Sequence, residues 1–195
     1  MIFQGPLSAA RQHRSQKFYY IFNLINGLSY MCLGETVIIL LAVKIKSSDA
    51  TVAVLGSMSF FGYLMLPLGK KLTSHVGAVK TQAICWVLRN ISALIVASSA
   101  IFYWLNLTVP ATFLLLGGAW LFYGFRSAGV VMSQPLVGDI AVEKERGKVL
   151  AISNALFFGS CLLALFCITL LLQRNQSIWV LVGVIAFGAM CGIFA

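Results

Sequence analysis

The sequence predicts an all-α polytopic membrane protein with six transmembrane helices. Of its 195 residues, 60% are hydrophobic and only 10% are charged, whereas a typical soluble domain has about 25% charged residues. The apolar residues occur in blocks about as long as the roughly 20 residues that a helix needs to cross roughly 30 Å of hydrocarbon. No segment shows the alternating polarity of a membrane β-barrel strand.

Six apolar blocks give the expected helices. Residues 1–17 are the expected cytoplasmic N-terminal segment, and residues 18–195 the expected bundle. Its spans lie at about 18–43, 51–68, 81–105, 111–134, 149–172 and 177–195. We expect "GKKLTSHVGAVK" and "GDIAVEKERGK" to be the longer, charged internal loops. The last block ends at Ala195 with no basic anchor after it, so we expect the chain to stop before a second half of a larger protein.

The distribution of charge predicts the topology. The net charge is +9. Nine Lys and Arg precede the first span or follow the second and fourth, and three lie on the opposite side. The positive-inside rule therefore places the N-terminus in the cytoplasm. We expect the membrane to be the plasma (cell inner) membrane. The basic excess indicates contact with anionic membrane lipid and argues against a nucleic-acid partner.

Arg126 is the most informative residue, because it lies in the otherwise apolar stretch "YGFRSAGVV". It is about fifteen residues, or roughly 22 Å, from the external end of its span, so its side chain cannot easily reach a headgroup layer. A charged residue at this depth should face the bundle interior or a wet cavity. An anion or a carboxylate is the natural partner of a guanidinium, and we expect Arg126 to bind substrate.

Other polar residues at a similar depth extend this expected substrate site. They come from the first, third and fifth spans: Asn23, Asn26, Tyr30, Arg89, Asn90 and Asn154. Asn23, Asn26 and Tyr30 share one helix face, because they are three and four residues apart. The alternative is that the asparagines only hold helices together through hydrogen bonds.

Glu35 is the one acid inside a predicted span. It lies about 25 Å from the cytoplasmic start of its helix, and on the face opposite Asn26. We expect a proton or cation site near the outer mouth and no ion pair with Arg126, although a kink near Gly27 or Gly34 would bring Glu35 round.

Absent residue types exclude much enzyme chemistry. The only histidines, His13 and His75, lie outside the spans, which argues against metal, haem or Ser-His chemistry within the membrane. No phosphate-binding loop motif occurs. The five cysteines lie in apolar blocks without a CxxC pair, as small buried hydrophobic residues do. We expect no enzyme, no metal and no cofactor.

Small residues predict close helix packing in the last two spans. Gly147, Ala151, Ala155 and Gly159 recur every four residues in the fifth span. Gly188 and Gly192 have the same spacing in the sixth. Such small-xxx-small ridges let a second helix backbone approach closely.

Three stretches carry a resemblance to a known family. "LPLGKKLTSHVGAVK" joins the second and third spans, and Asp139 and Arg146 after the fourth span have six residues between them. Arg126 and Gly129 lie in the fourth span. From Phe18 onward this layout resembles the N-terminal six-helix half of a major facilitator superfamily transporter: its signature loop, its acid-x6-arginine element and its fourth-helix arginine-glycine motif. The signature loop departs from the family, since its acid and its basic pair are missing, and the arginine-glycine motif has one residue fewer.

The resemblance implies a 3+3 inverted repeat and secondary active transport, by alternating access, of a small polar or anionic solute. It implies that the first and fourth helices line the cavity, and that a second six-helix half, a missing C-terminal domain or a second copy, completes the protein. A cytoplasmic gate would comprise Asp139, Arg146, Gly69, Lys70 and Lys71. The alternative from another class is a non-transporting membrane scaffold or interaction subunit whose polar layer is structural.

Overall fold

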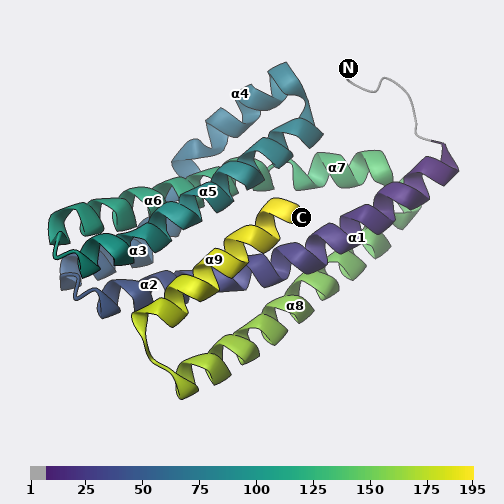
Figure 1. Cartoon of the computed structure of the whole chain (residues 1–195). Helices are drawn as coiled ribbons and strands as arrows, with labels where there is room; N and C mark the ends of the chain where they lie inside the picture. The colour runs from purple at the N-terminus through teal and green to yellow at the C-terminus, as the bar shows by residue number, and fades with distance from the viewer. Residues whose placement is uncertain (1–7) are drawn as a thin grey trace.

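The structure is a computed structural model that describes residues 8–195 (Figure 1). This range contains only helices and their connections, in agreement with the predicted all-α class. The elements are α1 (Ala9–Cys32), α2 (Glu35–Lys44), α3 (Asp49–Gly62), the short 3-10 helix η1 (Tyr63–Met65), α4 (Leu66–Val76), α5 (Ala78–Trp104), α6 (Thr108–Val130), α7 (Ser133–Ile140), the 3-10 helix η2 (Glu143–Glu145), α8 (Arg146–Arg174) and α9 (Ile178–Phe194).

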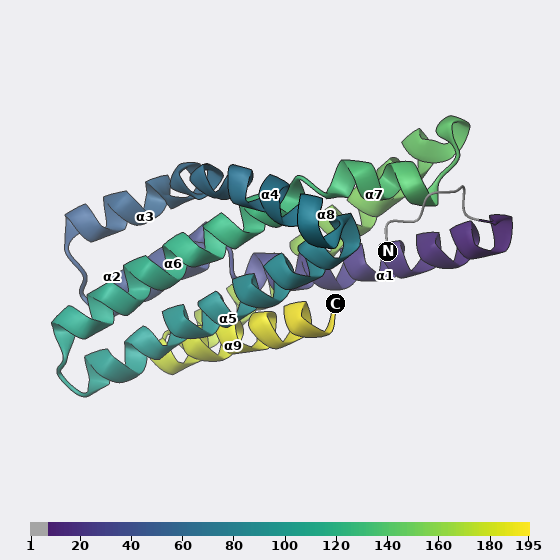
Figure 2. The same ribbon diagram turned by 90° about the horizontal axis from the view of Figure 1, so that it is seen from above.

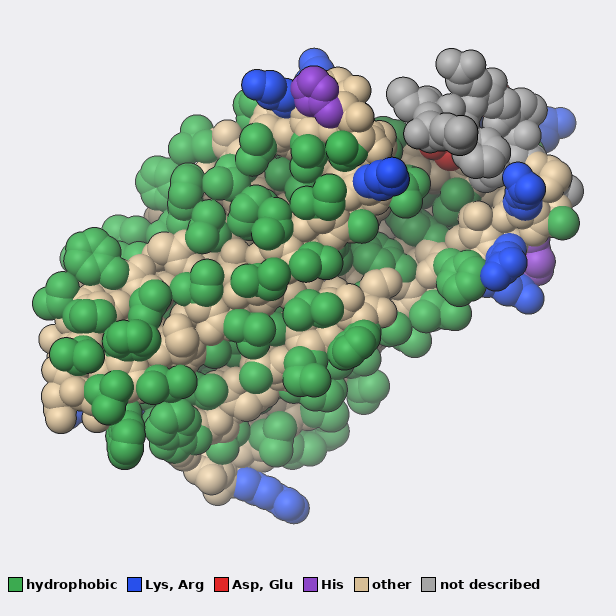
Figure 3. Space-filling model, turned by 45° about the horizontal axis from the view of Figure 1, so that its top comes forward, with side chains coloured by type: hydrophobic (Ala, Val, Ile, Leu, Met, Phe, Trp, Pro, Cys, Tyr) green, Lys and Arg blue, Asp and Glu red, His purple; other side chains and the backbone are tan. Residues whose placement is uncertain are grey.

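The lengths and surface of these helices indicate a membrane-embedded protein. Within residues 8–195, five helical segments are long and apolar enough to cross a membrane, and α9 is a shorter apolar helix of 17 residues. Figure 3 shows hydrophobic side chains over the middle of the molecule, with Lys and Arg gathered toward its ends. Phe113 and Phe194 are 73% and 80% exposed. An exposed apolar surface of this extent suits lipid and not water.

Three of the six predicted spans are pairs of helices in succession. The first breaks at Leu33 and Gly34, between α1 and α2. The second passes through η1 into α4, and the fourth runs from α6 into α7. The broken first span has a consequence for Glu35, which becomes the first residue of a separate helix.

The prediction of two long charged loops was wrong, because most of both segments is helical. α4 extends to Val76 because one of its faces is apolar: Leu72 packs toward Trp86 and Ala128. The chain then turns at Gly77, whose φ of +86° suits glycine. In the second segment, α7 extends to Ile140 and η2 precedes α8.

α5 is the central helix of the bundle. It packs along both α6 and α9, while α1 packs along α8 and α9. α3 and α4 pack on α6. Figure 2 shows the resulting layers, with α3 and α4 on one side of α6, and α5 and α9 on the other. α8 is the most peripheral long helix, since only 17% of its most apolar stretch is buried, against 56% for that of α5.

Small residues mark some helix contacts, but not all of those that were predicted. Gly188 and Gly192 do lie at close contacts, where an added Cβ would meet Cys32 and Asn90. The ridge predicted on α8 makes no close helix contact within the described part of the chain. Gly147 and Gly159 face open space, and Ala151 and Ala155 are exposed.

α8 packs on α1 through a different face. Ser160 and the Phe157 backbone lie directly against Gly27 of α1, and Ser153 and Ala164 are buried on the same side of α8. The glycine that permits this crossing is therefore on α1, which leaves the small-residue ridge of α8 on the outside.

Candidate functional site: two arginines inside the bundle

The first arginine, Arg89 of α5, is 1% exposed. Its Nη1 donates to Asn26 Oδ1 at 3.0 Å, and its Nη2 donates to Ser29 Oγ at 3.3 Å. Both acceptors come from α1. Nη2 also lies 3.5 Å from Asn90 Oδ1, at the limit of a hydrogen bond. Arg89 therefore joins α1 to α5 through neutral oxygen atoms.

Aromatic and amide groups complete this buried cluster of Asn26, Ser29, Trp86, Arg89 and Asn90, called here the Arg89 cluster. The guanidinium lies over the Trp86 ring, 4.8 Å from its centroid, where a cation–π interaction is favourable. Trp86 Nε1 donates to Asn26 Oδ1 at 2.9 Å, and Asn90 Nδ2 donates to the Trp86 carbonyl at 2.7 Å. Asn26 thus accepts two hydrogen bonds with the same oxygen.

α9 closes the Arg89 cluster from a third side. An added Cβ on Gly192 would lie 2.5 Å from Ser29 Oγ and would meet the Asn90 amide. Only a glycine lets the α9 backbone approach so closely. Of the Arg89 donors, Nε has no hydrogen-bond partner in the described part of the chain. The cluster is therefore closed to solute and suited to holding three helices together.

The second arginine, Arg126 of α6, has a different environment. It is half-buried, and its guanidinium lies over the Tyr30 ring of α1, 4.5 Å from the centroid. Tyr30 in turn contacts the Phe157 ring of α8 at a centroid distance of 5.7 Å. Within residues 8–195 the Arg126 guanidinium makes no hydrogen bond. Its five N–H donors remain available to water or a ligand.

The backbones of α1 and α6 make little contact. The Tyr30–Arg126 side-chain pair connects these two helices. Tyr123, one turn before Arg126, has a buried hydroxyl without a hydrogen-bond partner among the described residues. The charged groups of Glu35 and Arg126 lie within electrostatic range of that hydroxyl. These four residues come from the two predicted spans that were expected to line a cavity, and we call them the open face.

Glu35 is exposed at the N-terminus of α2. Its Oε1 is 3.7 Å from the position that a Cβ on Gly56 of α3 would occupy. The carboxylate therefore lies beside α3 and does not form an ion pair with Arg126. The break at Gly34 brings Glu35 toward the open face, as the sequence suggested a kink there could do.

Two predicted substrate residues lie outside both groups. Asn23 donates from Nδ2 to the Tyr19 carbonyl of its own helix at 2.8 Å. Asn154 is exposed on α8, one turn before Phe157. The structure thus divides the single polar layer expected from the sequence. Asn26 and Arg89 belong to the Arg89 cluster, Tyr30 and Arg126 belong to the open face, and Asn23 and Asn154 join neither.

The expected gate residues have separate contacts. Arg146 donates to the carbonyls of Gly138 and Ala141 at 3.2 and 3.4 Å, so it caps the end of α7, and Asp139 is exposed. Gly69 lies against the Ala128 backbone of α6, which makes it a close contact between α4 and α6. Lys70 and Lys71 are exposed on α4.

Sequence reasoning missed three members of these groups. Ser29 and Trp86 hold Arg89, and the Tyr123 hydroxyl lies in the open face. Helical spacing is the signal that would have found them. Ser29 is three residues from Asn26, Trp86 is three residues from Arg89, and Tyr123 is three residues from Arg126. Each therefore lies on the same helix face as a residue already selected.

No family model, curated protein or solved structure matches this chain. Within residues 8–195, no group of three or more His, Cys, Asp or Glu side chains is arranged to hold a metal ion. The chemical character of the site therefore comes from the two arginines and their surroundings.

Proposed function

We propose that the chain is the N-terminal six-helix half of a major-facilitator-type secondary transporter that moves a small polar or anionic solute by alternating access. Arg126 binds the anionic or polar group of the solute, with Tyr30 and the Tyr123 hydroxyl beside it. Glu35 is the proton or cation site nearer the outer mouth. The two halves of the complete protein rock about this central site.

One observation carries the proposal: Arg126 is half-buried inside the bundle, with no hydrogen bond to a described residue. A guanidinium at bilayer depth is costly unless an anion, water or an aromatic face compensates its charge. Tyr30 covers only one face of its plane. The edge, which carries the donors, is left for a ligand.

The pattern of helix pairs supports the 3+3 repeat. If the first three spans are matched in order to the last three, α1 corresponds to α6, α3 to α8 and α5 to α9. The α1–α8 pair then corresponds to the α6–α3 pair, and the α5–α6 pair corresponds to the α9–α1 pair. The α5–α9 pair corresponds to itself. All of these pairs are packed in the structure. This correspondence is what two inverted three-helix repeats would produce.

Two surfaces support a second six-helix half. The small-residue ridge on α8 is exposed along its length, and such ridges suit close contact with another helix. The open face also lies between α1 and α6, where the backbones have little contact. A second half placed over these surfaces would enclose Arg126.

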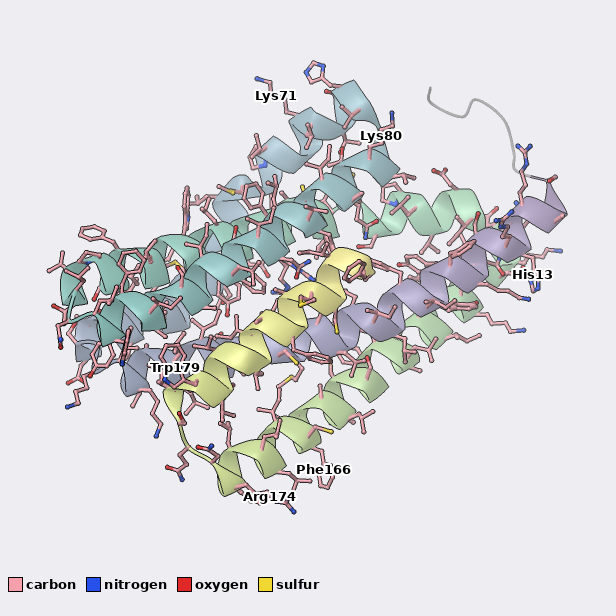
Figure 4. All side chains as sticks on the ribbon, in the orientation of Figure 1. His13, Lys71, Lys80, Phe166, Arg174 and Trp179 are labelled. Atoms are coloured by element: carbon pink, nitrogen blue, oxygen red, sulfur yellow. The ribbon has the colours of Figure 1, made fainter. Side chains whose placement is uncertain are left out.

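The proposed orientation places the N-terminus in the cytoplasm of a plasma (cell inner) membrane. His13 and Lys80 lie toward one end of the bundle, and Trp179 and Arg174 lie toward the other (Figure 4). The first end carries most of the basic residues that precede or follow the spans. The positive-inside rule assigns that end to the cytoplasm. There, Asp139 and Arg146 would pair in the state that closes the gate, with Gly69, Lys70 and Lys71 on the facing helix.

A ligand screen on the purified full-length protein tests the proposal. Thermal unfolding in detergent is followed with panels of small carboxylates, phosphate esters, and neutral and cationic solutes. We expect at least one anionic or polar solute to raise the unfolding midpoint of the wild type but not of Arg126→Gln. Arg174→Gln, which changes an exposed arginine at the end of α8, is the matched control. Uptake of that solute into proteoliposomes should show the same dependence.

The scaffold alternative makes the opposite prediction. It is favoured by the Arg89 cluster, in which Arg89 and Trp86 of α5 donate hydrogen bonds to Asn26 and Ser29 of α1. If the whole polar layer has this role, no solute shifts the midpoint in an Arg126-dependent way, and Arg126→Gln lowers the yield of folded protein. That result would replace the transporter proposal with the scaffold.

A further inference from the structure

A cavity lies on the side of the bundle formed by α1, α5 and α9, away from the open face. It is a cleft of about 620 Å³, between the N-terminal halves of α1 and α5 and below the end of α9. Its walls are mainly apolar, with Phe18 and Ile21 from α1, Val79 and Val87 from α5, and Phe194 from α9. Phe18, Val79 and Phe194 are 60%, 66% and 80% exposed. The cleft is therefore an apolar groove that opens to the surroundings of the bundle.

One polar side chain lies on its wall. Gln82 is 8% exposed and lines the groove. Its amide has two donors and an acceptor. Gln82 can therefore hydrogen-bond a polar group that enters the groove, such as an ester carbonyl.

Basic residues lie next to wall residues at the end of the groove that the charge distribution assigns to the cytoplasm. Arg14 lies over the Phe18 ring, 5.6 Å from its centroid, and Phe18 is part of the wall. Lys80 follows the wall residue Val79 at the start of α5, where Figure 4 labels it. Arg11 and Lys17 lie on the same helix as Arg14. Two acids, Asp139 and Glu143, are within three residues of the wall residue Ile140, so these basic residues outnumber the acids.

Apolar walls below a basic rim are complementary to one kind of molecule. A phospholipid with an anionic headgroup offers acyl chains to the walls, ester carbonyls at the next level and a phosphate at the rim. We propose that this groove is a binding site for one anionic phospholipid, with its headgroup between Arg14 and Lys80 and an acyl chain against Phe18 and Val87.

This lipid would also support the Arg89 cluster. Trp86 lines the groove with one side, and with the other side it contacts Arg89 and donates to Asn26. An acyl chain in the groove would hold Trp86 in the position that these contacts need. The proposal does not depend on transport, because neither Tyr30 nor Arg126 lines this groove.

Native mass spectrometry of the full-length protein tests the site. The protein is released from nanodiscs that contain equal amounts of phosphatidylglycerol and phosphatidylcholine with identical acyl chains. We expect one phosphatidylglycerol to remain bound in preference to phosphatidylcholine. Each of Arg14→Gln and Lys80→Gln should weaken its retention about fivefold. Lys71→Gln, an exposed lysine on α4 outside the groove, should leave it unchanged.

A second pair of variants tests the apolar walls without a change in charge. Ala83→Phe fills the groove, so it should abolish the retained lipid. Ala53→Phe, on the exposed surface of α3, is its control. Equal retention of both lipids, or full retention of phosphatidylglycerol by Ala83→Phe, would overturn the site. A protein segment cross-linked into the groove in place of lipid would do the same.

Discussion

Arg89 and Arg126 are the same residue type in the same bundle, yet their surroundings differ in nearly every respect. Arg89 is enclosed by groups from α1, α5, α6 and α9, and two neutral oxygens of α1 accept its hydrogen bonds. Arg126 is half-buried, and one aromatic ring of α1 is its main neighbour. One guanidinium is held by hydrogen bonds within the protein, and the other has no hydrogen-bond partner among the described residues.

The difference shows that burial does not by itself identify a binding residue. A buried charge is costly to leave unpaired, so a protein that keeps one for structural use must supply partners. Arg89 has those partners, and the function that follows is cohesion between helices. Arg126 makes no hydrogen bond to a described residue, which is the condition that a bound anion would improve.

The largest expected effect comes from removal of the enclosed guanidinium. Arg89→Ala leaves a cavity and removes the hydrogen-bond donor of Asn26 and Ser29. We expect the free energy of unfolding to fall by at least about 3 kcal/mol, measured by reversible denaturation in mixed micelles. Arg174→Ala, at an exposed helix end, should change it by less than about 0.5 kcal/mol. Similar values for the two variants would contradict a structural role for Arg89.

A smaller effect separates two asparagines that the sequence placed on one face. Asn26→Ala removes the oxygen that accepts from both Trp86 and Arg89, so we expect a loss of about 2 kcal/mol. Asn23 bonds only to its own helix. Asn23→Ala should therefore cost less than about 0.5 kcal/mol in the same denaturation assay. An equal cost would mean that the two share one role.

The glycine contact of α9 gives a matched test on one helix. Gly192→Ala places a Cβ against Asn90 and Ser29, and should cost about 1.5 kcal/mol through strain in the Arg89 cluster. Gly183→Ala on the same helix meets nothing within 4 Å. That variant should be neutral or slightly stabilising, because alanine favours helix. Thermal unfolding midpoints rank the two, and a lower midpoint for Gly183→Ala would contradict the packing of α9.

The smallest expected effect sharpens the other side of the comparison. A double-mutant cycle with Arg126→Gln and Tyr30→Leu should give a coupling energy of about 0.5–1 kcal/mol, as for a partly solvated cation–π pair. A coupling of several kcal/mol would mean that Tyr30 fully satisfies Arg126. The guanidinium would then resemble Arg89 and would have little left to offer a solute.

Sequence reasoning succeeded where composition alone decides. Each of the six apolar blocks lies in one helix or in two successive helices, because a long run of apolar residues in lipid has to satisfy its backbone within the helix. It failed at the charged segments. Leu72 packs toward α5 and α6 and so keeps α4 helical, and that contact depends on residues far away in the chain.

The candidate site was predictable in content but not in arrangement. The sequence by itself determined the apolar helices, the position of each polar residue along its helix, and the presence of two arginines and several asparagines within those helices. Only the tertiary structure decided which arginine is enclosed, which α8 face meets α1, and that Glu35 lies beside α3. The physical reason is that the position along one helix follows from the sequence, whereas partners follow from how helices rotate and cross. Those rotations are fixed by contacts such as Gly27 with Phe157 and Gly192 with Asn90.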